Sequence, residues 1–253
     1  MNYYLTDCIF IKDNTTYYEE NNKIKKVTKH NWHHYLYDYG WTKLDLGWKR
    51  RLKETENKNS CFGVLECGSE GDCLFYVLSE ALNSELLFNF DAKKHSVESL
   101  RSLAANEITD DNFDVILETY KLEYTENETC FNGDWDPYAV DTKEELRDVI
   151  TDGSDFWGDH ILLQLLQKKL EVNIIILNSD NNIETQNIDE RFTIHPIASH
   201  DLTKYEKTIV IYYLDQFHFQ LIGYFNGNQM ISIFKTDEIP KVLLDVYNKD
   251  CRN

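Results

Sequence analysis

The segment from Val64 to Leu82 constrains the fold most, because its character changes twice within a short length. A short apolar run is followed by the glycine-containing turn 68–72 and then by an apolar pattern that begins at Cys73. A short apolar run bounded by turn residues is typical of a buried strand, and a longer one of a buried helix. The segment therefore predicts a strand, a tight turn and a buried helix whose first residue is Cys73.

The rest of the chain mixes helical and β-rich patterns. Thr142 and Glu145 form a capping box at the start of one helix, because each side chain can bond to the other residue's backbone N–H. Helices are predicted at about 96–106, 113–119, 142–150, 161–170 and 237–247, and strands at 172–177, 208–214, 217–225 and 230–234. Residues 123–139 are expected to form a surface loop. The predicted fold class is α/β or α+β, with helices packed on a mixed sheet.

The chain is expected to have three parts. Residues 1–58 are rich in Tyr, Asn and charge and are interpreted as an N-terminal appendage, helical or irregular. Residues 59–235 form the main domain, and residues 236–253 a C-terminal helix or tail. The sequence leaves open whether the appendage caps the domain or binds a partner.

Charge argues against some classes of partner. Twenty-six Lys and Arg against 44 Asp and Glu give a net charge of −18, which repels phosphate backbones and anionic lipids. Nucleic acid is therefore not expected as a partner, while a basic protein or peptide would be attracted. Membrane insertion is not expected either, because the longest apolar runs are far shorter than the roughly 20 residues that span a bilayer. The amino terminus lacks the pattern of a secretory signal, so an intracellular, cytoplasmic location is expected.

Six cysteines are too few in a chain of 253 residues to indicate a disulfide scaffold. No CxxC pair occurs, so a structural zinc site is not expected. Cys73 differs from the others by its place at a turn that leads into a helix. Free backbone N–H groups and the helix N-terminus can stabilise a thiolate and later an oxyanion there, although a buried structural cysteine is the ordinary alternative.

Three motifs favour the interpretation of Cys73 as a nucleophile. The run Gly71-Asp72-Cys73-Leu74-Phe75 resembles the cysteine motif of the ovarian-tumour (OTU) cysteine proteases. The run 156–161, with Trp157 and Gly158, together with the following apolar run 172–176, resembles the family's Trp-Gly segment and strand. The run 217–222 resembles its histidine strand. The motifs occur in the family's order over about residues 60–225, and Gly-Asp-His after Trp157 is similar to OTU domains of large DNA viruses and bacterial effectors.

The resemblance implies an OTU-like, papain-type fold in which His218 is the general base for Cys73. His160 is a second histidine that could lie near the cleft, but the family's motif has no histidine at that position. The resemblance also implies a third group that holds the imidazole, and here the chain departs from the family. Glu70 stands where Asp is common, and Gln220 stands where Asn or Asp occurs.

The choice of third group stays open, with Glu70 favoured and Asp215 an outside possibility. A carboxylate adds an opposite charge to its hydrogen bond with imidazolium, whereas Gln220 lies two residues from His218 on one strand face. Glu66, Glu70 and Asp72 together also oppose thiolate formation. The turn around Gly71 and Asp72, with Trp157 and Gly158, is the expected oxyanion and substrate region.

The implied function is a thiol-dependent isopeptidase that removes ubiquitin or a ubiquitin-like modifier from conjugates, including polyubiquitin. It needs no cofactor or metal, and a monomer is expected. The alternatives are an OTU-fold ubiquitin-binding module without useful turnover and an unrelated papain-like peptidase.

Overall fold

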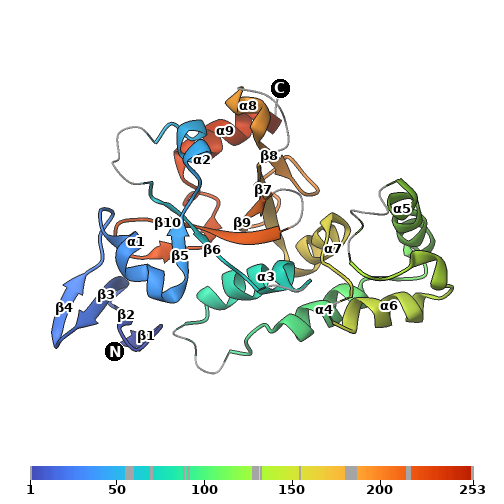
Figure 1. The fold of residues 1–253 in the computed structure, drawn as a ribbon, viewed down its shortest axis with the longest axis horizontal. Coiled ribbons are helices and arrows are strands. Elements are labelled where there is room, and N and C mark those ends of the chain that lie inside the picture. Colours follow the sequence, from blue (N-terminus) through green and yellow to red (C-terminus); the bar gives the residue numbers. More distant parts are fainter. Residues whose placement is uncertain are drawn as a thin grey trace.

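The structure is a computed structural model that describes residues 2–54, 60–68, 71–87, 89, 92–126, 131, 133–153, 155–179, 187–214 and 218–251. The described residues form two sheets and the helices around them (Figure 1). The larger sheet and the helices on its two faces confirm the predicted mixed α/β class.

The larger sheet is mixed and contains the predicted strands. Its strands are β5 (Trp41–Lys43), β6 (Phe62–Leu65), β7 (Val172–Ser179), β8 (Phe192–Pro196), β9 (Lys207–Leu214), β10 (His218–Phe225), β11 (Met230–Ile231) and β12 (Ile233–Lys235). The main path runs β5-β6-β10-β9-β7-β8, with β11 beside β10 and β12 beside β9. Strand β7 is parallel to β9, and the other pairs are antiparallel. Strands β5 and β8 are not among the strands predicted from the sequence.

Helices cover both faces of this sheet because its strands are apolar on both sides. Along β7, Ile174 and Ile176 join one core cluster, and Ile175 and Leu177 join another. The first cluster is covered by α3 (Cys73–Ser84), α4 (Val97–Asn106) and α7 (His160–Leu170). The second is covered by α2 (Leu46–Arg51) and α9 (Lys241–Cys251), with α8 (Ile188–Arg191) nearby (Figure 1). The helix that carries Cys73 is therefore packed directly on the sheet.

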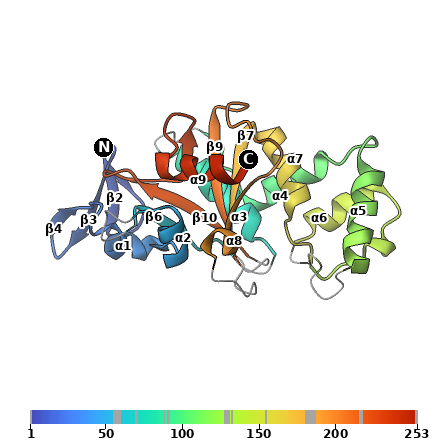
Figure 2. The same cartoon turned by 90° about the horizontal axis from the view of Figure 1, so that it is seen from above.

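The helices α5 (Phe113–Glu126) and α6 (Lys143–Thr151) project from one end of the molecule, together with the short η3 (Pro137–Ala139) (Figure 2). Helix α6 begins with the predicted capping box between Thr142 and Glu145. Helix α5 continues to Glu126, so the predicted loop begins a few residues too early. The lobe formed by α5 and α6 is joined to the rest of the molecule through α4, which packs against both α6 and α7.

Residues 3–26 form strands, which corrects the expectation of a helical or irregular segment there. A four-stranded antiparallel sheet contains β1 (Tyr3–Tyr4), β2 (Ile9–Lys12), β3 (Thr15–Glu20) and β4 (Lys23–Lys26). Two-residue turns join β2 to β3 and β3 to β4. Asp13, Asn14, Asn21 and Asn22 all have positive φ in these turns, a conformation that Asn and Asp tolerate in tight hairpins. These residue pairs were the signal for the hairpins.

Helix α1 (Trp32–Tyr35) and η1 (Leu36–Tyr39) then lead into β5, which pairs with β6. The division of the chain at residues 58 and 235 stays a prediction. In the described part of the chain, no helix combines the length and the apolar character that a membrane crossing needs.

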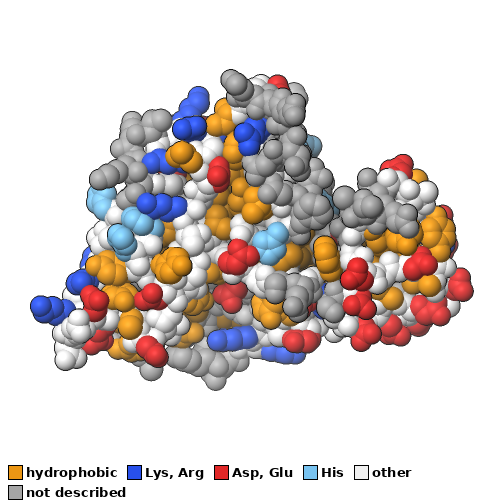
Figure 3. Space-filling view, viewed as in Figure 1, with side chains coloured by type: hydrophobic (Ala, Val, Ile, Leu, Met, Phe, Trp, Pro, Cys, Tyr) orange, Lys and Arg blue, Asp and Glu red, His pale blue; other side chains and the backbone are white. Residues whose placement is uncertain are grey.

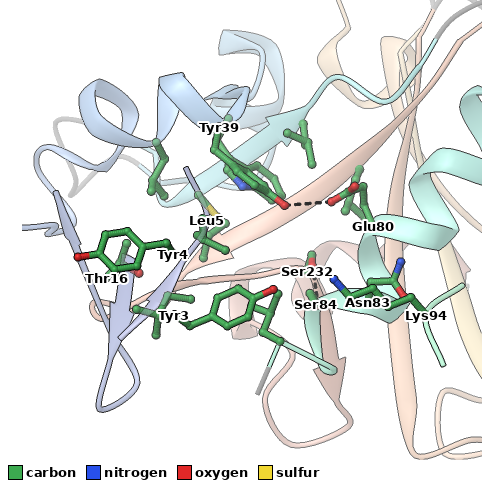
Figure 4. A pocket seen from close by; sticks show the side chains of 17 residues that line it. Tyr3, Tyr4, Leu5, Thr16, Tyr39, Glu80, Asn83, Ser84, Lys94 and Ser232 are labelled. Atoms are coloured by element: carbon green, nitrogen blue, oxygen red, sulfur yellow. Dashed lines mark hydrogen bonds between the residues drawn. The ribbon is translucent and has the colours of Figure 1, made fainter. Parts of the chain in front are cut away.

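A cavity of about 200 Å³ lies between the N-terminal sheet and the second half of α3 (Figure 4). Tyr39 points across it and donates a hydrogen bond to Glu80 of α3, at 3.1 Å. Cys73 and His218 are not among the described residues that line it. The predicted chemistry is therefore located at the other end of α3.

Candidate active site

Cys73 is the first residue of α3 and lies where the helix packs against β10. Only 7% of the residue is exposed. Its position leaves the first backbone N–H groups of α3 without partners inside the helix, and the helix dipole favours negative charge at this end. Burial alone would disfavour a thiolate, so the site needs a cation close to the sulfur.

His218 supplies that charge from the start of β10. The pKa of His218 is raised above its ordinary value, first by a hydrogen bond with Cys73 and further by Glu66, while burial opposes the rise. A raised pKa means that the imidazolium persists to higher pH, as a thiolate–imidazolium pair requires. The structure therefore brings together the two residues that the sequence pairs.

Glu66 holds the imidazole, a role for which the sequence favours Glu70. Its carboxylate bonds His218 Nε2 through one oxygen and accepts from the Gln220 side-chain amide through the other. This leaves Nδ1 as the ring nitrogen available to the Cys73 thiol. Gln220 thus orients Glu66 instead of bonding to the imidazole directly.

The register of β6 and β10 explains this arrangement. Leu65 is paired with Leu221 in antiparallel strands. Glu66, which follows Leu65, is therefore level with Gln220, which precedes Leu221. His218 is two residues from Gln220 and faces the same side. A search for a carboxylate opposite the histidine strand would have found Glu66, but that search needs the strand register.

The turn before Cys73 is organised by glycine and by an ion pair. Gly71 has a φ of +90° and Gly68 one of +67°, a backbone region that other residues rarely occupy. Asp72 forms an ion pair with Arg101 at 2.6 Å. The charge of Asp72 is therefore balanced, and that of Glu66 is directed at His218. These two pairings reduce the acidic opposition to thiolate formation that the sequence suggests.

Gly158 packs closely against the nucleophile helix, next to the half-buried Trp157. A Cβ added at Gly158 would lie 2.6 Å from Leu74 Cδ2, which is too close for two carbon atoms. Since Leu74 follows Cys73, the Trp-Gly segment is in direct contact with the start of α3. The two predicted parts of the oxyanion and substrate region are adjacent.

Three of the other described cysteines fit the nucleophile's role less well. Burial raises the pKa of Cys67 to about 12 and that of Cys251 to about 11, and it also raises the pKa of Cys61. Thiols with raised pKa values are weak nucleophiles at neutral pH because little thiolate is present. His160 packs its ring against Tyr213 and Phe219, with centroids 5.4 and 6.2 Å apart.

Two predicted residues, Glu70 and Asp215, lie outside the described residues. Among the residues that the structure does describe, no group of three or more His, Cys, Asp or Glu side chains is placed to hold a metal ion.

Comparison with known proteins gives one family. Residues 68–219, more than half of the chain, match the family model described as OTU-like cysteine protease. No curated protein matches the chain significantly.

Similar solved structures include an OTU domain in complex with ubiquitin, at 15% identity and a TM-score of 0.45 over 74% of this chain and 83% of that chain. The viral OTU protease from Dera Ghazi Khan virus gives 17% identity and a TM-score of 0.40, over 68% of this chain and 82% of that chain. The OTU deubiquitinase from Wolbachia pipientis wMel bound to ubiquitin gives 15% identity and a TM-score of 0.42, over 66% of this chain and 98% of that chain.

Because these TM-scores are low, the assignment rests on the family match. That match contains Cys73, His218 and the Trp-Gly segment, while Glu66 lies just before it. The chain belongs to the OTU-like cysteine protease family.

Proposed function

We propose that the chain is an isopeptidase that removes ubiquitin or a ubiquitin-like modifier from conjugates, with Cys73 as nucleophile and His218 as general base. The observation that carries the proposal is the chain of contacts from Cys73 through His218 to Glu66. A thiol beside an imidazole that is itself held by a carboxylate is suited to acyl transfer. Ubiquitin as the modifier follows from the resemblance of the three motifs to OTU enzymes.

The reaction proceeds in two halves. The Cys73 thiolate attacks the carbonyl at the modifier's carboxyl end, and the negative oxygen of the tetrahedral intermediate is stabilised by backbone N–H groups at the start of α3. The His218 imidazolium gives its proton to the leaving lysine amine, and a thioester forms. His218 then takes a proton from water, the resulting hydroxide attacks the thioester, and the modifier leaves with a free carboxylate while the thiol is restored.

Glu66 acts on His218 throughout both halves. It keeps Nε2 engaged, so that Nδ1 is presented to the thiol, and its negative charge stabilises the imidazolium. Gln220 fixes the other oxygen of Glu66 and so limits rotation of the carboxylate.

Incubation with a panel of differently linked di-ubiquitins, and with conjugates of ubiquitin-like modifiers, tests the proposal. Wild-type protein and the Cys67→Ala variant are expected to cleave at least one member, and Cys73→Ala none. Cys73→Ala should still fold, because alanine is a good helix former and only a thiol is lost. Cleavage by folded Cys73→Ala would show that Cys73 is not the nucleophile. Binding of ubiquitin without cleavage by the wild type would favour the binding-module alternative, and cleavage of ordinary peptides alone would favour a papain-like peptidase.

A further inference from the structure

Arg101 of α4 is a buried charge that contacts the turn before Cys73. Only 2% of the residue is exposed. Its Nε donates to Asp72 Oδ1 at 2.8 Å, and its Nη2 lies 2.6 Å from the same oxygen. Nη2 also donates to the carbonyls of Gly71 and Phe156 at 3.3 and 3.1 Å, and Nη1 to that of Ile150 at 2.8 Å. One guanidinium group therefore holds three chain segments.

These segments are the parts that form the candidate active site and its support. Gly71 and Asp72 precede the nucleophile, Phe156 precedes Trp157 and Gly158, and Ile150 lies at the end of α6. The guanidinium also stacks over the Phe75 ring of α3, 4.4 Å from its centroid. A planar fork with five N–H donors can bind several acceptors at fixed angles, which a lysine ammonium cannot reproduce.

The direction of these hydrogen bonds sets the direction of the neighbouring amides. In a trans peptide the C=O and the N–H point opposite ways. Because the Gly71 carbonyl points at Arg101, the Asp72 N–H points away from the buried guanidinium. The Asp72 carbonyl accepts from Tyr76 N–H inside α3, so the Cys73 N–H points out of the helix start. Two adjacent amides are thus fixed next to the nucleophile.

We infer that Arg101 is a positioning residue for acyl transfer, which fixes the turn at Gly71 and Asp72 so that the N–H groups of Asp72 and Cys73 meet the oxyanion. The inference rests on the proposed function, because it takes Cys73 as the nucleophile. Arg101 does not touch the reacting atoms. It acts through the peptide groups that it holds.

Two reactions of the same thiol separate this role from a general structural one. Iodoacetamide alkylates the thiolate with loss of iodide and forms no oxyanion. p-Nitrophenyl acetate acylates the thiol through a tetrahedral oxyanion and releases p-nitrophenolate, after which water frees acetate. Both rates are measured at Cys73 in full-length protein, with Cys73→Ala as background, and kcat and KM are measured on a cleavable di-ubiquitin.

The variant is Arg101→Lys and the matched control is Arg147→Lys. Arg147 of α6 also donates twice to a backbone carbonyl, but that carbonyl belongs to Ile108, which follows the end of α4 and is not part of the turn before Cys73. Arg101→Lys is expected to lose at least about tenfold in acylation and in kcat, since displaced oxyanion donors cost this much or more. Alkylation and KM should change by less than about twofold, because the thiolate–imidazolium pair is intact. Arg147→Lys should leave all four values near wild type.

A folded Arg101→Lys with wild-type acylation, or with acylation and alkylation reduced equally, would overturn the inference. The inference would also be overturned if Arg147→Lys lost as much in acylation and in kcat as Arg101→Lys does. If Arg101→Lys does not fold, Asp72→Asn keeps the shape of the contact and removes its charge, and it should show the same selective loss of acylation to a smaller degree. Ester acylation at Cys73 does not require ubiquitin, so wild-type acylation without cleavage of any modifier conjugate would count against the proposed function alone.

Discussion

At the level of single residues, the contact between Glu66 and His218 has the clearest effect on reactivity. The pKa of His218 is raised mainly by Cys73 and additionally by Glu66, against burial. Replacing Glu66 with Gln removes the negative charge, so the pKa of His218 falls and the imidazolium is lost at lower pH. We predict that Glu66→Gln loses about tenfold in kcat/KM, equivalent to about 1.4 kcal/mol. The alkaline limb of its pH profile should move to lower pH.

The comparison variants are Gln220→Ala and Glu70→Gln. Gln220→Ala should lose less than Glu66→Gln, because Gln220 acts only on the carboxylate that holds the histidine. The side chain of Glu66 is 62% exposed, so high salt should narrow the difference between Glu66→Gln and wild type. A larger loss in Glu70→Gln, with Glu66→Gln close to wild type, would restore the assignment that the sequence favours.

At the level of secondary structure, the start of α7 carries a buried carboxyl group. Asp159 caps this helix by accepting from Leu162 N–H at 2.8 Å and interacts with the phenol of Tyr120. Burial raises the pKa of Asp159 to about 6. The folded state therefore binds the proton more tightly than the unfolded state, whose carboxyl has a pKa of about 3.9. Its contribution to stability is complete below that value and is lost as pH rises through about 6.

We predict that Asp159→Asn matches wild type near pH 4 and is more stable by about 2 kcal/mol at pH 8, because the amide is uncharged and still caps the helix. Urea unfolding at the two pH values measures this. Asp45→Asn is the control, since Asp45 caps α2 in the same way but is exposed. An unchanged difference between Asp159→Asn and wild type at both pH values would show that burial does not disfavour this charge.

Local and long-range features differ in how far the sequence predicts them. The capping box at Thr142 is contained in four consecutive residues, so the start of α6 is predicted correctly. The contact of Glu66 with His218 depends on the pairing of Leu65 with Leu221, and strand register is set by the whole sheet. Arg101 reaches Asp72 because α4 packs beside α3, which no local pattern reveals. The nucleophile was therefore predictable, while its supporting contacts were not.

The N-terminal strands were missed for a different reason. Strands β3 and β4 carry many polar residues, so the alternation of apolar and polar side chains is weak. The pairs Asp13-Asn14 and Asn21-Asn22 mark their hairpins more clearly than hydrophobicity does.

At the level of the whole molecule, charge is unevenly distributed. Carboxylates gather over the lobe formed by α5 and α6, whereas Lys, Arg and His side chains are more frequent over the opposite end (Figure 3). A modifier with a basic carboxyl-terminal tail would be attracted toward the acidic surface, and salt screens such attraction. We predict that KM for a ubiquitin substrate rises between low salt and about 0.5 M salt, well beyond the range where exposed charges interact.

Neutralising three exposed carboxylates, Asp111 just before α5 and Asp114 and Glu118 on α5, should reduce this salt dependence. The control is Glu20→Gln on β3, at the opposite end of the molecule. A KM that does not respond to salt would show that the acidic surface has no part in substrate binding.

Covalent capture by ubiquitin with a carboxyl-terminal electrophile tests the central claim most directly, because it reports the nucleophile and the modifier together. The account predicts one adduct on wild-type protein, located at Cys73 by mass spectrometry of the digested protein. The adduct should be absent from Cys73→Ala, strongly slowed in His218→Ala and unchanged in Cys67→Ala. An adduct on another cysteine, or no adduct on folded wild-type protein with any modifier of the ubiquitin class, would contradict it.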